Sequence, residues 1–310
     1  MLKIFQIMRP YLIALAIPLF LIIINYIVEI NASLLIGVAA ICIIAIAMMR
    51  SAIINKIIST DVDYIGNIVV LTCCIRNFSM ISRMYENLPS IPAKISSKFC
   101  YMLSRIIDLH QGIVVSSNNT HTITAMWESP DEAPSYHQVA TCSLMMIDNL
   151  AILNSSLKSE DMPLINIGIG LSASIAAKDD FSEYLTKKTS VYRINLLISE
   201  ELALSLNKDF IVVEIDRILI KNESVPIYTI IGSNNFLSSN HQIISYQHHN
   251  KFLRAYREKR WDVASSIANG LKNAWHNKLK DYYIHMIEQC KYLKDHPPND
   301  EWDVLYKIGK

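Results

Sequence analysis

Two long apolar runs stand out near the start of the chain, at 11–28 and 34–49, and neither contains a charged residue. With its flanks, each approaches the ~20 residues that a helix needs to cross a bilayer. Basic residues flank the pair, whereas the short loop between the runs carries only Glu29. The positive-inside rule then places both ends of the hairpin in the cytoplasm.

This pattern predicts a membrane anchor over 1–58 with two transmembrane helices, and a multi-pass protein of the inner or cell membrane. A cleaved signal peptide is the alternative, because a basic start precedes an apolar core. The second apolar run, which follows at once, favours the anchor.

Strand and helix signals alternate over 59–235, which predicts a cytoplasmic domain. The apolar run at 68–75 is typical of a buried strand, and 95–109 has the spacing of an amphipathic helix. The pattern favours an α+β fold with helices on one face of a sheet. The charged segment 178–189 is expected to be a surface link. Further strands are expected at 113–117, 122–127, 164–176, 196–198, 210–221 and 226–231, with helices at 78–88, 135–154 and 200–205.

The segment 236–310 is rich in Tyr, Trp and charge and is predicted to be a helical extension. Its spacing resembles one or two tetratricopeptide-like units. Trp275, Tyr282 and Tyr283 are expected to pack within this cap, and the pair His248-His249 is expected to be exposed.

Composition narrows the class of function. The chain of 310 residues has 29 Lys and Arg against 28 Asp and Glu, a net charge of +1, which argues against nucleic acid as a partner. The hydrophobic content of 51% argues against disorder. None of the six cysteines forms a CxxC pair, so no zinc knuckle or thioredoxin motif is indicated. Glycine is scarce, at 8 residues, where usage of about 7% would give roughly 22.

Five short strings occur in a fixed order along the chain: Ile-Arg-Asn-Phe-Ser at 75–79, Ala-Met-Trp at 125–127 before Pro130, Ile-Gly-Ile-Gly at 167–170, Leu-Ile-Ser-Glu at 197–200, and Val-Glu-Ile-Asp-Arg at 213–217 before Pro-Ile-Tyr at 226–228. In this order they resemble the class III adenylate and guanylate cyclases, which convert ATP or GTP to a cyclic nucleotide and pyrophosphate. The resemblance implies a ferredoxin-like class III nucleotidyl cyclase domain. It also makes a nucleotide a possible partner.

The resemblance also says which catalytic residues to look for. Active members hold two Mg²⁺ or Mn²⁺ ions with two aspartates on adjacent strands, and a helix across a dimer interface supplies an Asn and an Arg. Here Cys74 occupies the first metal position, and counting back from Trp127 puts His121 at the second, with Thr120 the alternative. Sulfur is a poor ligand for magnesium, which prefers oxygen.

Other positions of the family motif also differ. Ser116 or Ser117 stands where active members carry a base-reading lysine, and the segment between Ser174 and Leu196 is too short for the Asn and Arg motif. Lys221 stands where active members place a lysine near the triphosphate, although a solvated hairpin lysine is the alternative.

Three hypotheses follow. The first is a catalytically degenerate cyclase that needs no cofactor and acts as a regulatory or dimerisation module, as a homodimer or with another cyclase-like chain. The second is an active adenylate cyclase whose site, with Mg or Mn, is completed by a partner subunit. The third is a redox or metal sensor at Cys73, Cys74 and His121, although adjacent strand residues face opposite sides of a sheet.

Overall fold

The computed structural model describes residues 67–119, 121–129, 136–174, 181–220, 223–234 and 239–298. Internal contacts divide the chain into two compact units, Met1–Asp61 and Val62–Lys310, and all the described residues lie in the second.

A seven-stranded sheet organises this unit, with the strand order β2-β3-β1-β4-β5-β7-β6. Neighbouring strands are antiparallel except for β4 and β5, which are parallel. The apolar runs predicted as strands at 68–75 and 196–198 are strands, and the structure is a mixture of strands and helices as predicted. The strands are β1 (Asn67–Ile75), β2 (Ile113–Asn119), β3 (Thr122–Ser129), β4 (Ile167–Ser174), β5 (Leu196–Ile198), β6 (Phe210–Ile220) and β7 (Glu223–Ser233).

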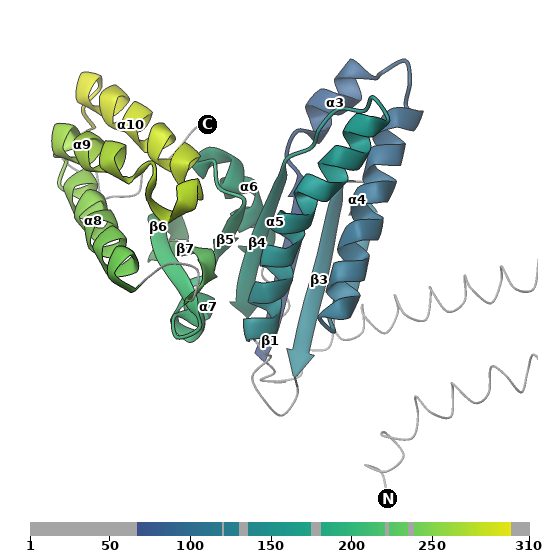
Figure 1. Cartoon of the computed structure of the whole chain (residues 1–310), viewed down its shortest axis with the longest axis horizontal. Coiled ribbons are helices and arrows are strands. Elements are labelled where there is room, and N and C mark those ends of the chain that lie inside the picture. Colours follow the sequence, from purple (N-terminus) through teal and green to yellow (C-terminus); the bar gives the residue numbers. More distant parts are fainter. Residues whose placement is uncertain are drawn as a thin grey trace, which may run out of the picture. The chain divides into compact units, whose positions relative to one another are not determined.

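Helices α4 (Ser90–Leu109) and α5 (Tyr136–Ser159) lie side by side over the first face of the sheet (Figure 1). Alternate strand residues such as Cys73 and Ile169 point into the core beneath these helices, where they are completely buried. The short helices α3 (Phe78–Met84) and α7 (Glu200–Leu206) complete this layer. This half of the structure follows the period-2 alternation expected of strands with one face in a core.

Helix α6 (Phe181–Tyr192) covers the second face, so the prediction of helices on one face only is wrong. The expected surface link at 178–189 forms most of this helix, which packs directly on β4. Its hydroxyl side chains satisfy buried hydrogen bonds: Thr186 Oγ1 donates to the Thr72 carbonyl over 2.9 Å, and Ser182 Oγ lies 2.8 Å from Thr72 Oγ1. The polar sequence of 178–189 therefore did not indicate that one face of this helix is buried.

Two glycines of β4 make this packing possible. A Cβ added at Gly170 would overlap the Ser182 carbonyl oxygen and lie 2.6 Å from the Thr186 amide nitrogen. A Cβ at Gly168 would overlap Thr189 Oγ1. The Ile-Gly-Ile-Gly string therefore alternates large residues for the first core with glycines that admit the α6 backbone.

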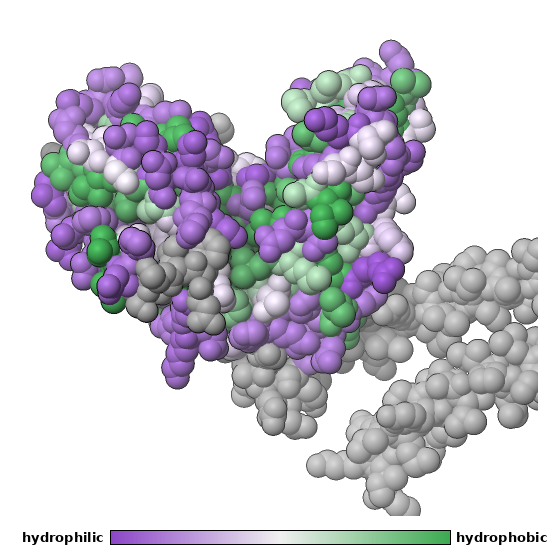
Figure 2. All heavy atoms as spheres, in the orientation of Figure 1, coloured by the Kyte–Doolittle hydropathy of each residue, from purple (hydrophilic) through white to green (hydrophobic). Residues whose placement is uncertain are grey.

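The C-terminal helices cover the rest of the second face, over β5, β6 and β7 (Figure 1). They are α8 (Ser239–Arg257), α9 (Trp261–Leu271) and α10 (Lys280–Asp295), with the short 3-10 turn η2 (Ala274–Asn277) before α10. Trp275, Tyr282 and Tyr283 are buried in a second core that also contains Leu185 of α6. Figure 2 shows a predominantly hydrophilic outward surface on these helices, which matches this inward direction of their apolar residues.

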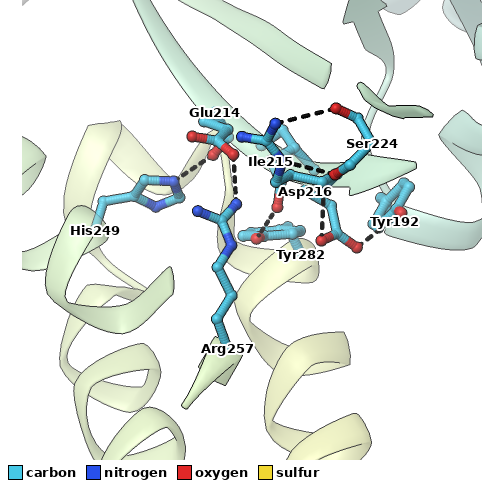
Figure 3. Close-up of polar contacts among 9 residues, drawn as sticks. Tyr192, Glu214, Ile215, Asp216, Ser224, His249, Arg257 and Tyr282 are labelled. Carbon is cyan, nitrogen blue, oxygen red and sulfur yellow. Dashed lines mark hydrogen bonds and ion pairs between the residues drawn. The ribbon is translucent and has the colours of Figure 1, made fainter. Parts of the chain in front are cut away.

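A buried polar network fixes the C-terminal helices to β6 (Figure 3). The register of β6 shifts between Glu214 and Asp216, and such a bulge turns backbone groups away from the ladder. His249 Nε2 bonds to the Glu214 carbonyl, and the Tyr282 hydroxyl donates to the Ile215 carbonyl over 2.7 Å. The helices thus satisfy backbone acceptors that would otherwise be buried without partners.

The prediction that His249 is exposed is wrong, because this side chain is completely buried. Its Nε2 faces a carbonyl and must carry the proton, so Nδ1 accepts from the Tyr283 hydroxyl 2.8 Å away. Burial lowers the pKa of His249 to about 4, which keeps the ring neutral at physiological pH.

Asp216 is the buried carboxyl of the same network. It accepts hydrogen bonds from the Tyr192 hydroxyl at 2.9 Å and from the Arg217 amide at 2.8 Å. Burial raises the pKa of Asp216 to about 6, and the two hydrogen bonds offset only part of that effect. Because Tyr192 ends α6, this pair joins α6 to the strand that carries the C-terminal helices.

Within the described ranges, no helix is both long and apolar enough to cross a bilayer. The predicted transmembrane hairpin and the predicted multi-pass membrane location therefore find no support in this part of the chain. The two longest helices, α4 and α5, expose charged side chains such as Lys94 and Asp148, which a bilayer interior would exclude. The runs 11–28 and 34–49 themselves lie outside the described residues.

The close contact between α6 and β4 predicts opposite effects for two glycine substitutions. Gly170→Ala should lower the free energy of unfolding by about 3 kcal/mol, because the backbone of α6 must move. Gly270→Ala is the control: no atom lies within 4 Å of its added Cβ, and alanine in a helix should add roughly 0.5–1 kcal/mol. Urea denaturation measures both, and equal effects at the two positions would contradict the packing argument.

The buried Asp216 predicts a pH-dependent stability difference. The pKa of Asp216 in the fold, about 6, lies above the ordinary 3.8. Its contribution to the stability of the fold is therefore present at low pH and lost as pH rises through 6. The side chain of Asp216→Asn cannot ionise. Between pH 4 and 7 the free energy of unfolding of the parent should therefore fall by about 3 kcal/mol relative to that of the variant.

Denaturation curves at a series of pH values test this, with the exposed Asp209→Asn as the matched control. His249 titrates in the opposite sense but is common to all the proteins, so its effect cancels in the difference. A parent-to-variant difference that stays flat over this pH range would show that Asp216 is not buried as described.

Candidate functional site

A polar cavity of about 630 Å³ lies between α6 and the ends of β1 and β3. The structure places both family metal positions on its wall: Cys74 from β1, and His121 immediately before β3. The strand register explains this, since Cys74 pairs with Thr122 and the Ile75 amide donates to the His121 carbonyl over 2.9 Å. The other lining residues are Thr72, Ile75, Arg76, Phe78, Ser79, Thr122, Thr124, Glu183, Thr186, Lys187 and Ser190.

The two adjacent cysteines of β1 point to opposite faces of the sheet. Cys74 lines the cavity, whereas Cys73 is completely buried in the first core. Burial raises the pKa of both thiols above the ordinary 9.0. Cys74 is therefore a neutral thiol at physiological pH, and its neighbour cannot share a ligand with it.

His121 is held flat against Phe78, with ring centroids 4.6 Å apart and an angle of 8° between the planes. Partial burial lowers the pKa of His121. The imidazole is therefore neutral at physiological pH, and neither family metal position carries a negative charge.

The metal ions that the cyclase resemblance implies do not fit these residues. The one carboxylate on the described wall is Glu183, which pairs with Lys187 over 2.7 Å on the exposed side of α6. Magnesium takes carboxylate and other oxygen ligands, whereas the two family positions offer a thiol and an imidazole. Among the described residues, no three His, Cys, Asp or Glu side chains are arranged to hold a metal ion.

Arg76 has a structural task that the sequence did not reveal. Its guanidinium donates to the Thr189 carbonyl at 3.3 Å, the Ile194 carbonyl at 3.0 Å and Asn195 Oδ1 at 2.8 Å. These acceptors lie at and just beyond the C-terminus of α6, and the Thr189 carbonyl also accepts from the Ile194 amide over 3.0 Å. Arg76 therefore fixes the turn from α6 to β5, and its positive charge compensates the negative end of the helix dipole.

Several predicted positions fall where the structure gives no side chain. Lys221 and Thr120 lie outside the described residues, as do the side chains of Ser116 and Ser117. Their proposed roles in binding a base or a triphosphate remain predictions.

The known proteins that resemble this chain share little of its sequence. No family model matches the chain, and no curated protein matches it either. Among solved structures, it is similar to the guanylyl cyclase Cya2, at 18% identity and a TM-score of 0.44, over 54% of this chain and 93% of that one. It is also similar to the adenylyl cyclase CyaB from P. aeruginosa, at 14% identity and a TM-score of 0.46, over 56% and 97%.

A third similar structure is the guanylate cyclase domain of RhGC from Catenaria anguillulae, at 15% identity and a TM-score of 0.43, over 55% of this chain and 98% of that one. All three are nucleotidyl cyclase proteins, the group that the sequence motifs resemble.

The bonds of Arg76 predict that its removal loosens the α6–β5 turn. Arg76→Ala should lower the free energy of unfolding by about 2 kcal/mol, since charge-assisted hydrogen bonds are lost and the carbonyl of the buried Ile194 loses this donor. The exposed Arg83→Ala on α3 should change it by less than about 0.5 kcal/mol. Urea denaturation measures the free energy of unfolding of each variant. In Arg76→Ala, amide hydrogen exchange should rise first at residues 189–196. Unchanged exchange there would refute this role.

Proposed function

We propose that this chain is a cyclase-like protein without cyclase chemistry of its own, which acts as a regulatory or dimerisation module in cyclic nucleotide signalling. Its partner would be a second copy or another cyclase-like chain. The observation that carries the proposal is the pair of neutral ligands, Cys74 and His121, at the two family metal positions.

The reaction explains why this pair matters. When a ribose 3′-oxygen attacks the α-phosphorus, negative charge develops on the phosphate oxygens and the leaving pyrophosphate, and cations must stabilise it. In the described cavity, Arg76 is bonded to the α6–β5 turn and Lys187 is paired with Glu183. In this cavity a triphosphate would therefore meet two cationic side chains that already have partners within the protein. It would meet no pair of carboxylates that could hold metal ions.

The region expected to supply the Asn and Arg supports the same proposal. Helix α6 is the described helix between β4 and β5, and its sequence contains neither an Asn nor an Arg. It therefore lacks the amide and the guanidinium that the family resemblance calls for. The fold could still serve as an assembly surface, because a module that binds a partner needs the shape and not the metals.

A cyclase assay on the full chain tests the proposal. The purified protein is incubated with ATP or GTP and with Mg²⁺ or Mn²⁺, and cyclic nucleotide is measured by mass spectrometry. We expect no product above that of heat-inactivated protein. Turnover by the chain alone would overturn the proposal. Product beyond the amount that an added complete cyclase chain makes by itself would favour the partner-completed enzyme instead.

Metal binding gives a second readout that does not need turnover. The parent should bind no Mn²⁺ at this cavity by titration calorimetry, whereas Cys74→Asp with His121→Asp should create a site, because two carboxylates would then face each other across β1 and β3. The control is Cys73→Asp with His121→Asp, in which one carboxyl would point into the opposite core. Binding by the parent would contradict the assignment of neutral ligands.

A further inference from the structure

A second cavity, of about 510 Å³, lies beside the first and shares Arg76 with it. It is formed where the end of β1, the α6–β5 turn and the segment entering α10 meet, so the sheet and the C-terminal helices both contribute to its wall. Ligand sites concentrate at such junctions, and their volumes are typically about 300–1,000 Å³.

The wall of this cavity carries an excess of positive charge. Arg76, Arg193 and Lys278 face one carboxylate, Asp281. Arg193 also pairs with Glu288 outside the cavity over 2.7 Å, through one of its guanidinium nitrogens. A guanidinium has five N–H donors in a planar fork, so this bond leaves others that can meet an anion.

Amide side chains supply further donors between the cations. Asn195 accepts from Arg76 through Oδ1 over 2.8 Å, so the polar group that it keeps for a ligand is its amide nitrogen, a donor. Asn277 also lines the cavity, next to Lys278 in the chain. Side-chain donors and cations together suit an anion with several acceptor oxygens.

Backbone conformation provides an independent observation at the same place. Arg193 and Asn277 have left-handed backbone conformations, with φ 52° and 63°. The two residues that precede Asn277 are also left-handed: Trp275 with φ 54° and His276 with φ 50°. Side chains disfavour this conformation, and it persists where packing enforces it, often at ligand sites. Here buried Trp275 anchors the turn through its indole N–H, 3.2 Å from the Tyr283 hydroxyl, and thereby presents Asn277 and Lys278 to the cavity.

We propose that this second cavity binds a small phosphate-bearing molecule of about mononucleotide size, which bridges the sheet and the C-terminal helices. Arg193 and the amide of Asn195 would hold the phosphate from the α6–β5 turn, and Lys278 and Asn277 from the segment before α10. The proposal does not depend on the absence of cyclase chemistry, because Cys74 and His121 line the other cavity.

Calorimetric titration of the full chain with AMP tests this proposal, with inorganic phosphate and the uncharged nucleoside adenosine as comparison ligands. AMP and phosphate should bind, and adenosine should not. Lys278→Glu should weaken AMP binding at least about tenfold, because a charge-assisted contact becomes repulsive. The control Lys291→Glu makes the same charge change at an exposed position of α10 that does not line the cavity, and it should leave the affinity unchanged.

A second variant separates binding from folding. Asn277→Gly relieves the positive φ and should raise the unfolding temperature, while it removes an amide donor and should weaken AMP binding. If the side chain had only a structural role, the affinity would not fall. Failure of AMP and phosphate to bind, equal losses in Lys278→Glu and Lys291→Glu, or a loss seen in His121→Ala but not in Lys278→Glu would each overturn the proposal.

Discussion

The close approach of the α6 backbone to β4 is the constraint on which the rest of the second face depends. It is possible only because Gly168 and Gly170 present no Cβ to the helix. With α6 seated at this depth, its buried hydroxyl groups reach β1 and its last residue, Tyr192, reaches Asp216 on β6. The position of one helix thus determines the wall of the first cavity, the α6–β5 turn and part of the second core.

The C-terminal helices extend this arrangement across β5, β6 and β7. Their apolar residues share a core with α6, so they form a layer of the same structure. The bulge in β6 sets their orientation, because its displaced carbonyls need donors and the buried His249 and Tyr282 supply them. Directional bonds of this kind specify one arrangement, whereas apolar contact alone tolerates several.

Much of the sheet could be predicted from the sequence, because continuous apolar runs such as 68–75 can hardly lie elsewhere than in a core. The positions of Cys74 and His121 followed from motif spacing, and the structure places both on one cavity. Helix α6 was missed because it buries hydroxyl groups, which mimic a surface pattern unless their partners on β1 are known. Burial of His249 likewise depends on contacts with residues far away in the chain.

Arg76 lines both the first and the second cavity of the described structure. The string Ile-Arg-Asn-Phe-Ser places this guanidinium at the end of β1, between the two cavities. There its guanidinium donates to the carbonyls of Thr189 and Ile194 and fixes the end of α6. Because the same bonds hold the wall shared by both cavities, a displacement of the α6–β5 turn would alter both at once. Coupling between sites requires such a shared element, and in the described structure Arg76 and this turn provide it.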